Sequence, residues 1–195
     1  MIKVLLLVVY PRRAWEKIAL AQKSISSIFF AFLLPLLAVS LAVELAGVVH
    51  WGKRLGPMRV PTQFPFQTIW RYGAAQFLAS LIMVFVGARL IKAVAVTFHN
   101  RNNYAQCFTI AAYGLSPFFA VRMFDAFIIV NPWLTFAVGA FLFAEAFYHG
   151  IPVVMKPDPP QAFGIYFMSS IWLVMIAGLL RLVTLLLLKG RANLF

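Results

Sequence analysis

The sequence predicts an all-α fold, a polytopic membrane bundle of five transmembrane helices preceded by an amphipathic interfacial helix. Of its 195 residues, 63% are hydrophobic and 11% are charged, whereas soluble domains carry roughly 25% charged residues. Five apolar runs reach the roughly 20 residues that a helix needs to cross a bilayer, and polar or proline-rich segments separate them. Lipid surroundings explain this composition better than a water-facing globule does.

Residues 1–24 form a basic segment, and residues 10–24 are expected to lie on the membrane as an amphipathic helix. Pro11 suits a first helical turn, where its missing N–H is not needed. At 100° per residue, one side of the helix carries Trp15, Ile18, Ala19, Ala21, Gln22 and Ile25. The other side carries Arg12, Arg13, Glu16, Lys17 and Lys23, and Leu20 alone breaks the pattern. We expect Arg12, Arg13, Lys17 and Lys23 to contact anionic headgroups; a short solvated helix is the alternative.

Residues 25–188 are expected to form the membrane domain. Its spans are predicted at residues 25–49, 71–97, 104–124, 132–155 and 162–188, followed by a short tail at 189–195. Residues 50–70 contain Pro57, Pro61 and Pro65, so this segment is expected to be a loop rather than a helix. Pro35 and Pro117 interrupt the first and third spans; such breaks line substrate paths in some proteins, but kinked bundle helices are commoner.

Arg181 is the least favourable residue in the last predicted span. An arginine near a span centre costs about 2.5–3.5 kcal/mol on the insertion scale. Residues 171–188 contain eight Leu and four Ile or Val, which together favour insertion by roughly 5 kcal/mol. The segment is therefore still predicted to cross the membrane.

Ionisable residues inside spans are candidates for function because charge is costly in lipid. They are Glu44, Arg122, Asp125, Glu145, His149 and Arg181. Glu145 and His149 are four residues apart, so they share a helix face and could hold a proton together; alternatively, Glu145 only pairs with Arg181 or with the backbone. Arg122 and Asp125 are three residues apart and are expected to form a structural ion pair near the interface.

Several functional classes lose support. Two candidate ligands on one helix fall short of a metal site, and no nucleotide-binding or hydrolase motif is present. We therefore expect no metal, no cofactor and no catalytic residue. The net charge of +12 comes from basic residues placed between apolar runs, which favours lipid headgroups over nucleic acid. Cys107 is expected to be a buried, inert thiol.

The order of several short motifs resembles the Yip-domain family, five-span membrane proteins named for interaction with Ypt/Rab GTPases. The likeness begins at Pro11 and Trp15, continues at Tyr113-Gly-Leu-Ser-Pro117, and ends at Tyr148-His-Gly-Ile-Pro152. It covers nearly the whole chain. Tyr10 stands where many prokaryotic relatives have an acidic residue, and the long N-terminal region of eukaryotic members is absent, so binding of a Rab-type GTPase is not expected.

The resemblance implies a short, bacterial-type member in the cytoplasmic (inner) membrane. Because of the basic block before the first span, the N-terminus is expected to lie in the cytoplasm. The expected function is non-enzymatic: a scaffold, similar to a trafficking protein, that organises lipid, another membrane protein or a second copy of itself. The alternative is a small transporter or channel that uses the intramembrane charges. Small residues in the fourth span, such as Gly139, indicate a close helix contact within the chain or between protomers.

Overall fold

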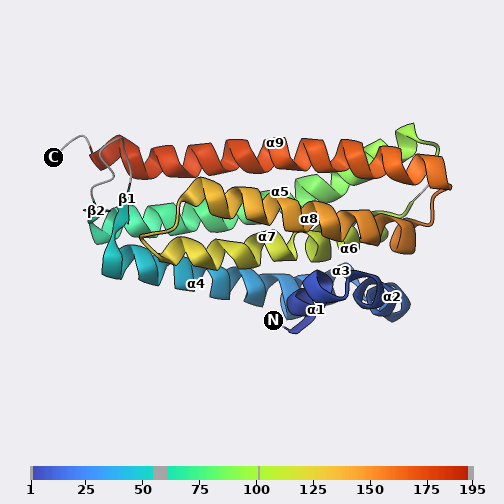
Figure 1. Cartoon of the computed structure of the whole chain (residues 1–195), viewed down its shortest axis with the longest axis horizontal. Helices are drawn as coiled ribbons and strands as arrows, with labels where there is room; N and C mark the ends of the chain where they lie inside the picture. The colour runs from blue at the N-terminus through green and yellow to red at the C-terminus, as the bar shows by residue number, and fades with distance from the viewer. Residues whose placement is uncertain (1, 55–60, 101, 193–195) are drawn as a thin grey trace.

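The computed structural model describes residues 2–54, 61–100 and 102–192, and its long helices run side by side along one axis (Figure 1). Five helical segments of the described chain are long and apolar enough to cross a membrane. They are Ile25–Trp51, Phe66–Thr97, Tyr104–Ala126, Pro132–Met155 and Pro159–Leu188. The predicted all-α fold with five spans is confirmed; the second span begins five residues earlier than expected, because the proline-rich segment ends at Pro65 and a helix can start there.

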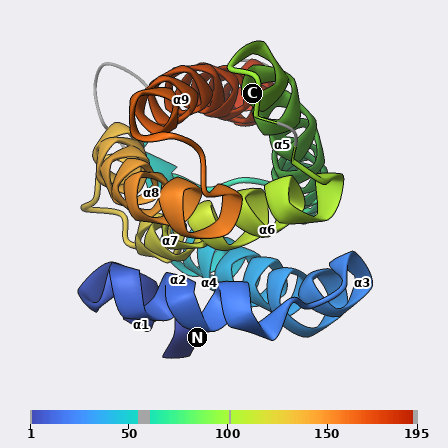
Figure 2. The ribbon, with the colours of Figure 1, turned by 90° about the vertical axis from the view of Figure 1, so that its right-hand side faces the viewer.

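Three short helices lie together at one end of the bundle, which we call the helical end (Figures 1 and 2). They are α1 (Ile2–Val9), α2 (Pro11–Ala21) and α3 (Ile25–Ile28). Of these, α1 was not predicted from the sequence. Its Val4 and Leu7 are buried, so it packs into the bundle although its eight residues are too short to span a membrane.

The first span continues from α3 through a π-helical stretch, η1 (Phe29–Leu33), into α4 (Leu34–Trp51). The wider π turn ends at Leu33, two residues before Pro35, and the helix continues through this proline without ending the span. Beyond Gly52, β1 (Lys53–Arg54) pairs antiparallel with β2 (Pro61–Thr62), Lys53 opposite Thr62. This two-stranded hairpin lies at the opposite end of the bundle (Figure 1), which we call the hairpin end.

The third span is the central one, because 72% of its most apolar window is buried, against 28–39% in the other spans. It consists of α6 (Tyr104–Gly114), α7 (Ser116–Val121) and the 3-10 turn η2 (Arg122–Ala126). It packs against α4, α5 (Phe66–Thr97) and α8 (Pro132–Met155), and α9 (Pro159–Ala192) packs on α5 and α8. Gly114 allows the break between α6 and α7 to lie against α8, since a Cβ there would overlap the ring of Phe147.

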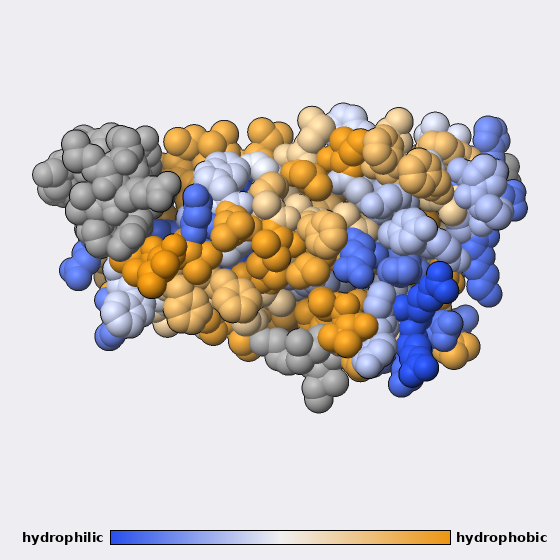
Figure 3. All heavy atoms as spheres, viewed as in Figure 1, coloured by the Kyte–Doolittle hydropathy of each residue, from blue (hydrophilic) through white to orange (hydrophobic). Residues whose placement is uncertain are grey.

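The outer surface has the pattern expected of a membrane protein. On the face in Figure 3, hydrophobic side chains cover the middle of the bundle, and hydrophilic ones gather at the helical end. Trp51, Phe66 and Trp70 are exposed near the ends of the first two spans. Aromatic side chains are enriched at this level in membrane proteins because they sit well among headgroups.

Candidate functional site

Glu44 is the centre of a group of charged side chains inside the hairpin end. It projects from α4 and is 1% exposed. Its Oε2 accepts a hydrogen bond of 2.8 Å from Nη2 of Arg122, and its Oε1 accepts one of 3.2 Å from Nζ of Lys53. The hydroxyl of Tyr72 also donates to Oε1. One carboxylate therefore joins α4, β1, α5 and η2.

A close backbone approach makes this arrangement possible. Gly47 lies one turn after Glu44 on α4, and a Cβ at Gly47 would lie 2.6 Å from the carbonyl carbon of Ala126 in η2. That distance is too short for any side chain, so glycine lets the two backbones touch. Arg122, at the start of η2, then lies within reach of Glu44.

Asp125 forms the second half of the group, with α8 and α9. Its carboxylate is buried and forms an ion pair with Nη2 of Arg181. It also contacts the hydroxyl of Thr135, and Nη2 of Arg181 donates to the carbonyl oxygen of Pro132 at 3.2 Å. The predicted pairing of Arg122 with Asp125 is wrong: both lie in η2, but each pairs with another span.

We call this group the charge network; its members are Glu44, Lys53, Tyr72, Arg122, Asp125, Thr135 and Arg181. It contains three cations and two carboxylates, all buried. Burial alone would lower the pKa of Lys53, but the nearby Tyr72, Glu44 and Asp125 outweigh it and raise this pKa above its ordinary value of 10.5. The neighbouring groups therefore favour the charged form of Lys53 in spite of its burial.

The space beside the charge network is small. A cavity of about 20 Å³ is lined by Gln76, Arg122 and Arg181, and another of about 10 Å³ is lined by Glu44, Ser40 and Arg122. Nε of both arginines and Nη1 of Arg181 have no hydrogen-bond partner in the described part of the chain. A cavity needs at least about 10–15 Å³ to hold one water, so these spaces suit single waters rather than a stream of solute.

Glu145 and His149 lie one turn apart on α8 and are both half-buried. Within residues 2–54, 61–100 and 102–192, neither forms an ion pair or a hydrogen bond through its side chain, so the expected pairing of Glu145 with Arg181 is not found; Arg181 is taken by Asp125. The ring of His149 contacts that of Tyr148, whose ring meets Tyr166 of α9 edge-on at 5.5 Å. The structure thus separates this pair from the four other predicted residues.

The N-terminal motif, Pro11 and Trp15, lies on α2, and α2 packs against α8. Pro11 is the first residue of α2, and Trp15 is fully buried. Gly150 lies under the indole, because a Cβ there would be 2.6 Å from Cε2 and Cζ2 of Trp15. The helix was expected to lie on the membrane with Trp15 on its apolar side, but at Trp15 this side packs on protein. Periodicity alone cannot distinguish these two surroundings.

The remaining motif residues have different surroundings. Tyr113 is buried at the end of α6, with its ring 4.3 Å from that of Phe32, and Pro117 is buried in the first turn of α7. Tyr148 is 54% exposed. Pro152 is also exposed and lies within the length of helix α8. Gly139 packs internally, since a Cβ there would lie 2.9 Å from Cδ2 of Phe118.

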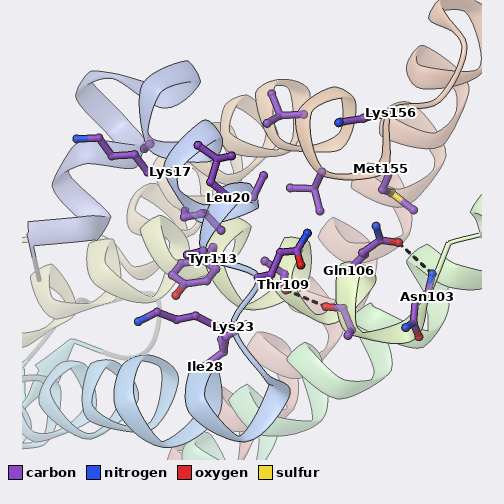
Figure 4. Close-up of a pocket in the computed structure, with 18 of the residues that line it drawn as sticks. Lys17, Leu20, Lys23, Ile28, Asn103, Gln106, Thr109, Tyr113, Met155 and Lys156 are labelled. Carbon is purple, nitrogen blue, oxygen red and sulfur yellow. Dashed lines mark hydrogen bonds between the residues drawn. The ribbon is translucent and has the colours of Figure 1, made fainter.

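A large pocket opens at the helical end, with a volume of about 740 Å³. Its walls come from α2, the start of α6 and the end of α8 (Figure 4). Lys17 and Lys23 line it, whereas Arg12 and Arg13 are exposed elsewhere on α2. The four predicted headgroup-binding residues therefore divide into two pairs.

Three members of the charge network were not predicted from the sequence: Lys53, Tyr72 and Thr135. Lys53 was assigned to a loop, and no local pattern links Tyr72 or Thr135 to a carboxylate. The searched residues contain no group of three or more His, Cys, Asp or Glu side chains that could hold a metal ion.

Comparison with known proteins adds one match. The model of the Yip1 domain family matches residues 5–182. No curated protein and no solved structure matches the chain.

Proposed function

Because the chain belongs to the Yip1 domain family, we propose that this multi-pass membrane protein is a non-enzymatic scaffold, which docks another membrane protein through a polar site on α8. Its basic end would at the same time hold anionic lipid. The single observation that carries the proposal is a contrast within the described residues: the charge network is paired, whereas Glu145 and His149 form no ion pair or side-chain hydrogen bond.

The depth of Glu145 in the membrane makes the lack of a partner important. It lies ten residues before the end of α8 at Met155, which corresponds to about 15 Å along the helix and thus to the middle of a hydrocarbon layer about 30 Å thick. A polar group there is costly unless it finds a partner. A helix from another protein, carrying a hydrogen-bond donor at the same depth, would supply one.

The surroundings of Glu145 suit the approach of such a helix. Phe141 and Tyr148, one turn away on either side, are 72% and 54% exposed. Aromatic side chains contribute large contact areas at interfaces. A partner helix would bury these rings while pairing with Glu145 and His149.

A small transporter or channel is the main alternative. It would need a water-filled path past the intramembrane charges. The cavities beside the charge network, at about 20 and 10 Å³, weigh against such a path. Glu145 and His149 are the residues through which this alternative can be tested, because a half-buried acid near a histidine also suits proton transfer.

The proposed setting is a bacterial cytoplasmic membrane with the N-terminus in the cytoplasm. The helical end carries exposed Arg12, Arg13, Lys17 and Lys23, and basic residues are retained on the cytoplasmic side. Three basic residues of the hairpin end are instead buried in the charge network. A Rab-type GTPase is not among the proposed partners.

The test is site-specific photo-crosslinking in native membranes. A photoreactive residue at Phe141, beside Glu145, should crosslink to a membrane protein or to a second copy of the chain, and mass spectrometry would identify which. The crosslink should be lost in E145Q/H149Q and kept in E16Q/H50Q, which makes the same changes at exposed positions. A photoreactive residue at Leu179, exposed on α9, is the positional control.

Two outcomes would overturn the proposal. One is a Phe141 crosslink that is unchanged in E145Q/H149Q. The other is proton flux in vesicles reconstituted with the wild-type protein, abolished by E145Q while the protein remains folded. The second result would establish the transporter instead.

A further inference from the structure

The pocket at the helical end has the size of a ligand site. Its volume of about 740 Å³ lies within the range of roughly 300–1,000 Å³ that is usual for such sites. Segments far apart in the chain form it: α2 and the residues after it, Asn103 to Tyr113, and Val153 to Lys156. Figure 4 shows these segments around a common space.

The charge of the pocket has one sign. Lys17 comes from α2, Lys23 from the linker to α3, and Lys156 from the end of α8 (Figure 4). No Asp or Glu is among the residues that line it in the described chain. Three ammonium groups without a carboxylate favour an anion, and their polar neighbours Asn103, Gln106 and Thr109 offer hydrogen bonds.

The rest of the lining is apolar. Ala14, Ile18, Ile28, Val153, Val154 and Met155 contribute to the walls. Leu20, the residue that breaks the amphipathic pattern of α2, also lines the pocket and is 82% exposed. An exposed leucine among lysines suits a ligand that has both an anionic group and a hydrocarbon part.

The position along the spans identifies that ligand. Lys23 lies two residues before the first span, and Lys156 directly follows the fourth. Both are thus at the level of the headgroups, whereas Ile28 and Val153 lie inside spans, at the level of the acyl chains. The pocket changes from cationic to apolar in the same direction as a phospholipid changes from phosphate to hydrocarbon.

We propose that this pocket binds one anionic phospholipid, with its phosphate among Lys17, Lys23 and Lys156 and the upper part of its acyl chains against Ile28 and Val153. This deepens the lipid-holding part of the proposed function, but it does not depend on docking at Glu145, which lies a few turns away on α8. The two sites fail or succeed in separate experiments.

Native mass spectrometry of the detergent-purified protein tests the site with phosphatidylglycerol as the probe. The wild-type protein should retain one phosphatidylglycerol. K17Q/K23Q should bind it about thirtyfold more weakly, as expected for the loss of two lysine contacts with an anionic lipid. R12Q/R13Q is the matched control, because it removes the same charge from the same segment outside the pocket, and it should bind normally.

A105F is a second variant, which fills the pocket without changing any charge and should also lose the lipid. Phosphatidylcholine and inorganic phosphate distinguish the source of the anion: neither should displace phosphatidylglycerol at equal concentration. Equal binding by K17Q/K23Q and R12Q/R13Q would overturn the proposal, because the lipid would then respond only to total charge. Displacement by inorganic phosphate, or no retained lipid in the wild-type protein, would overturn it as well.

Discussion

Arg122 donates a hydrogen bond of 2.8 Å to Glu44, 78 positions earlier in the chain, and not to Asp125 three positions later. The pair joins the first and third spans inside the hairpin end. Removing one member of a buried ion pair leaves the other charge without compensation, and this costs far more than the net contribution of the pair. The charge network should therefore respond sharply to single substitutions.

Substitution of Glu44 by Gln should destabilise the protein by about 3–5 kcal/mol, because Arg122 and Lys53 then lose their buried carboxylate. Thermal unfolding in detergent, followed by size-exclusion chromatography of the remaining monodisperse protein, measures the effect. The matched control is E16Q, since Glu16 is exposed on α2 and its loss should be nearly neutral. Equal stability of the two variants would contradict a structural role for Glu44.

Asp125 and Arg181 should show strong coupling. D125L and R181L should each be destabilising, whereas the double variant D125L/R181L should be more stable than either, because a complete apolar replacement leaves no unpaired buried charge. A double-mutant cycle on unfolding temperatures measures the coupling free energy, expected at about 0.5–3 kcal/mol. Additive losses would show that the two side chains act independently.

Gly150→Ala should weaken the packing of α2 against α8, because the new methyl group would lie 2.6 Å from the ring of Trp15. Overpacking of this kind costs about 1–3 kcal/mol. A cysteine at the buried position Ala14 should then react faster with a water-soluble maleimide. Gly178→Ala is the control, since its Cβ would meet Phe136 at an ordinary 3.6 Å; faster labelling in both variants would refute a specific contact.

The raised pKa of Lys53 predicts that the stability of the folded protein changes at alkaline pH. Its pKa is raised above the ordinary 10.5 in the folded protein. Its contribution is therefore fully present below about pH 10.5 and is lost as the pH rises through the folded value. The stability advantage of wild type over K53Q should be constant from pH 8 to about pH 10 and should shrink above it. An advantage that persists unchanged at higher pH would show that Lys53 does not act through its charge.

The sequence was sufficient to predict the helices that cross the membrane. Long apolar runs have one solution in lipid, since every backbone polar group must be satisfied within the segment. Even Arg181 did not obscure the last span, because its leucines outweigh it. The short α1 was not predicted, since its eight residues, seven of them apolar, have neither the length of a span nor an amphipathic pattern.

The partners within the site could not be predicted from local spacing. Arg122 and Asp125 are neighbours in the chain, but η2 packs against α4 and α8. Arg122 pairs there with Glu44 of the first span, and Asp125 pairs with Arg181 of the fifth. Trp15 shows the same limit: an apolar helix face looks alike whether it meets lipid or protein, and the residue that decides, Gly150, lies on a different helix. Tertiary packing determined both outcomes.

Glu44 and Arg122 are 78 positions apart in the chain, and this separation affects how the protein is made and inserted. At about 5–20 residues per second, the ribosome needs about 4–16 s to synthesise that stretch, so the first helix reaches the translocon long before its arginine exists. Lys53 comes only nine positions after Glu44, so it is the first cation of the charge network to be synthesised. The contact between Lys53 and Glu44 can therefore form before the third helix, which carries Arg122, has been synthesised.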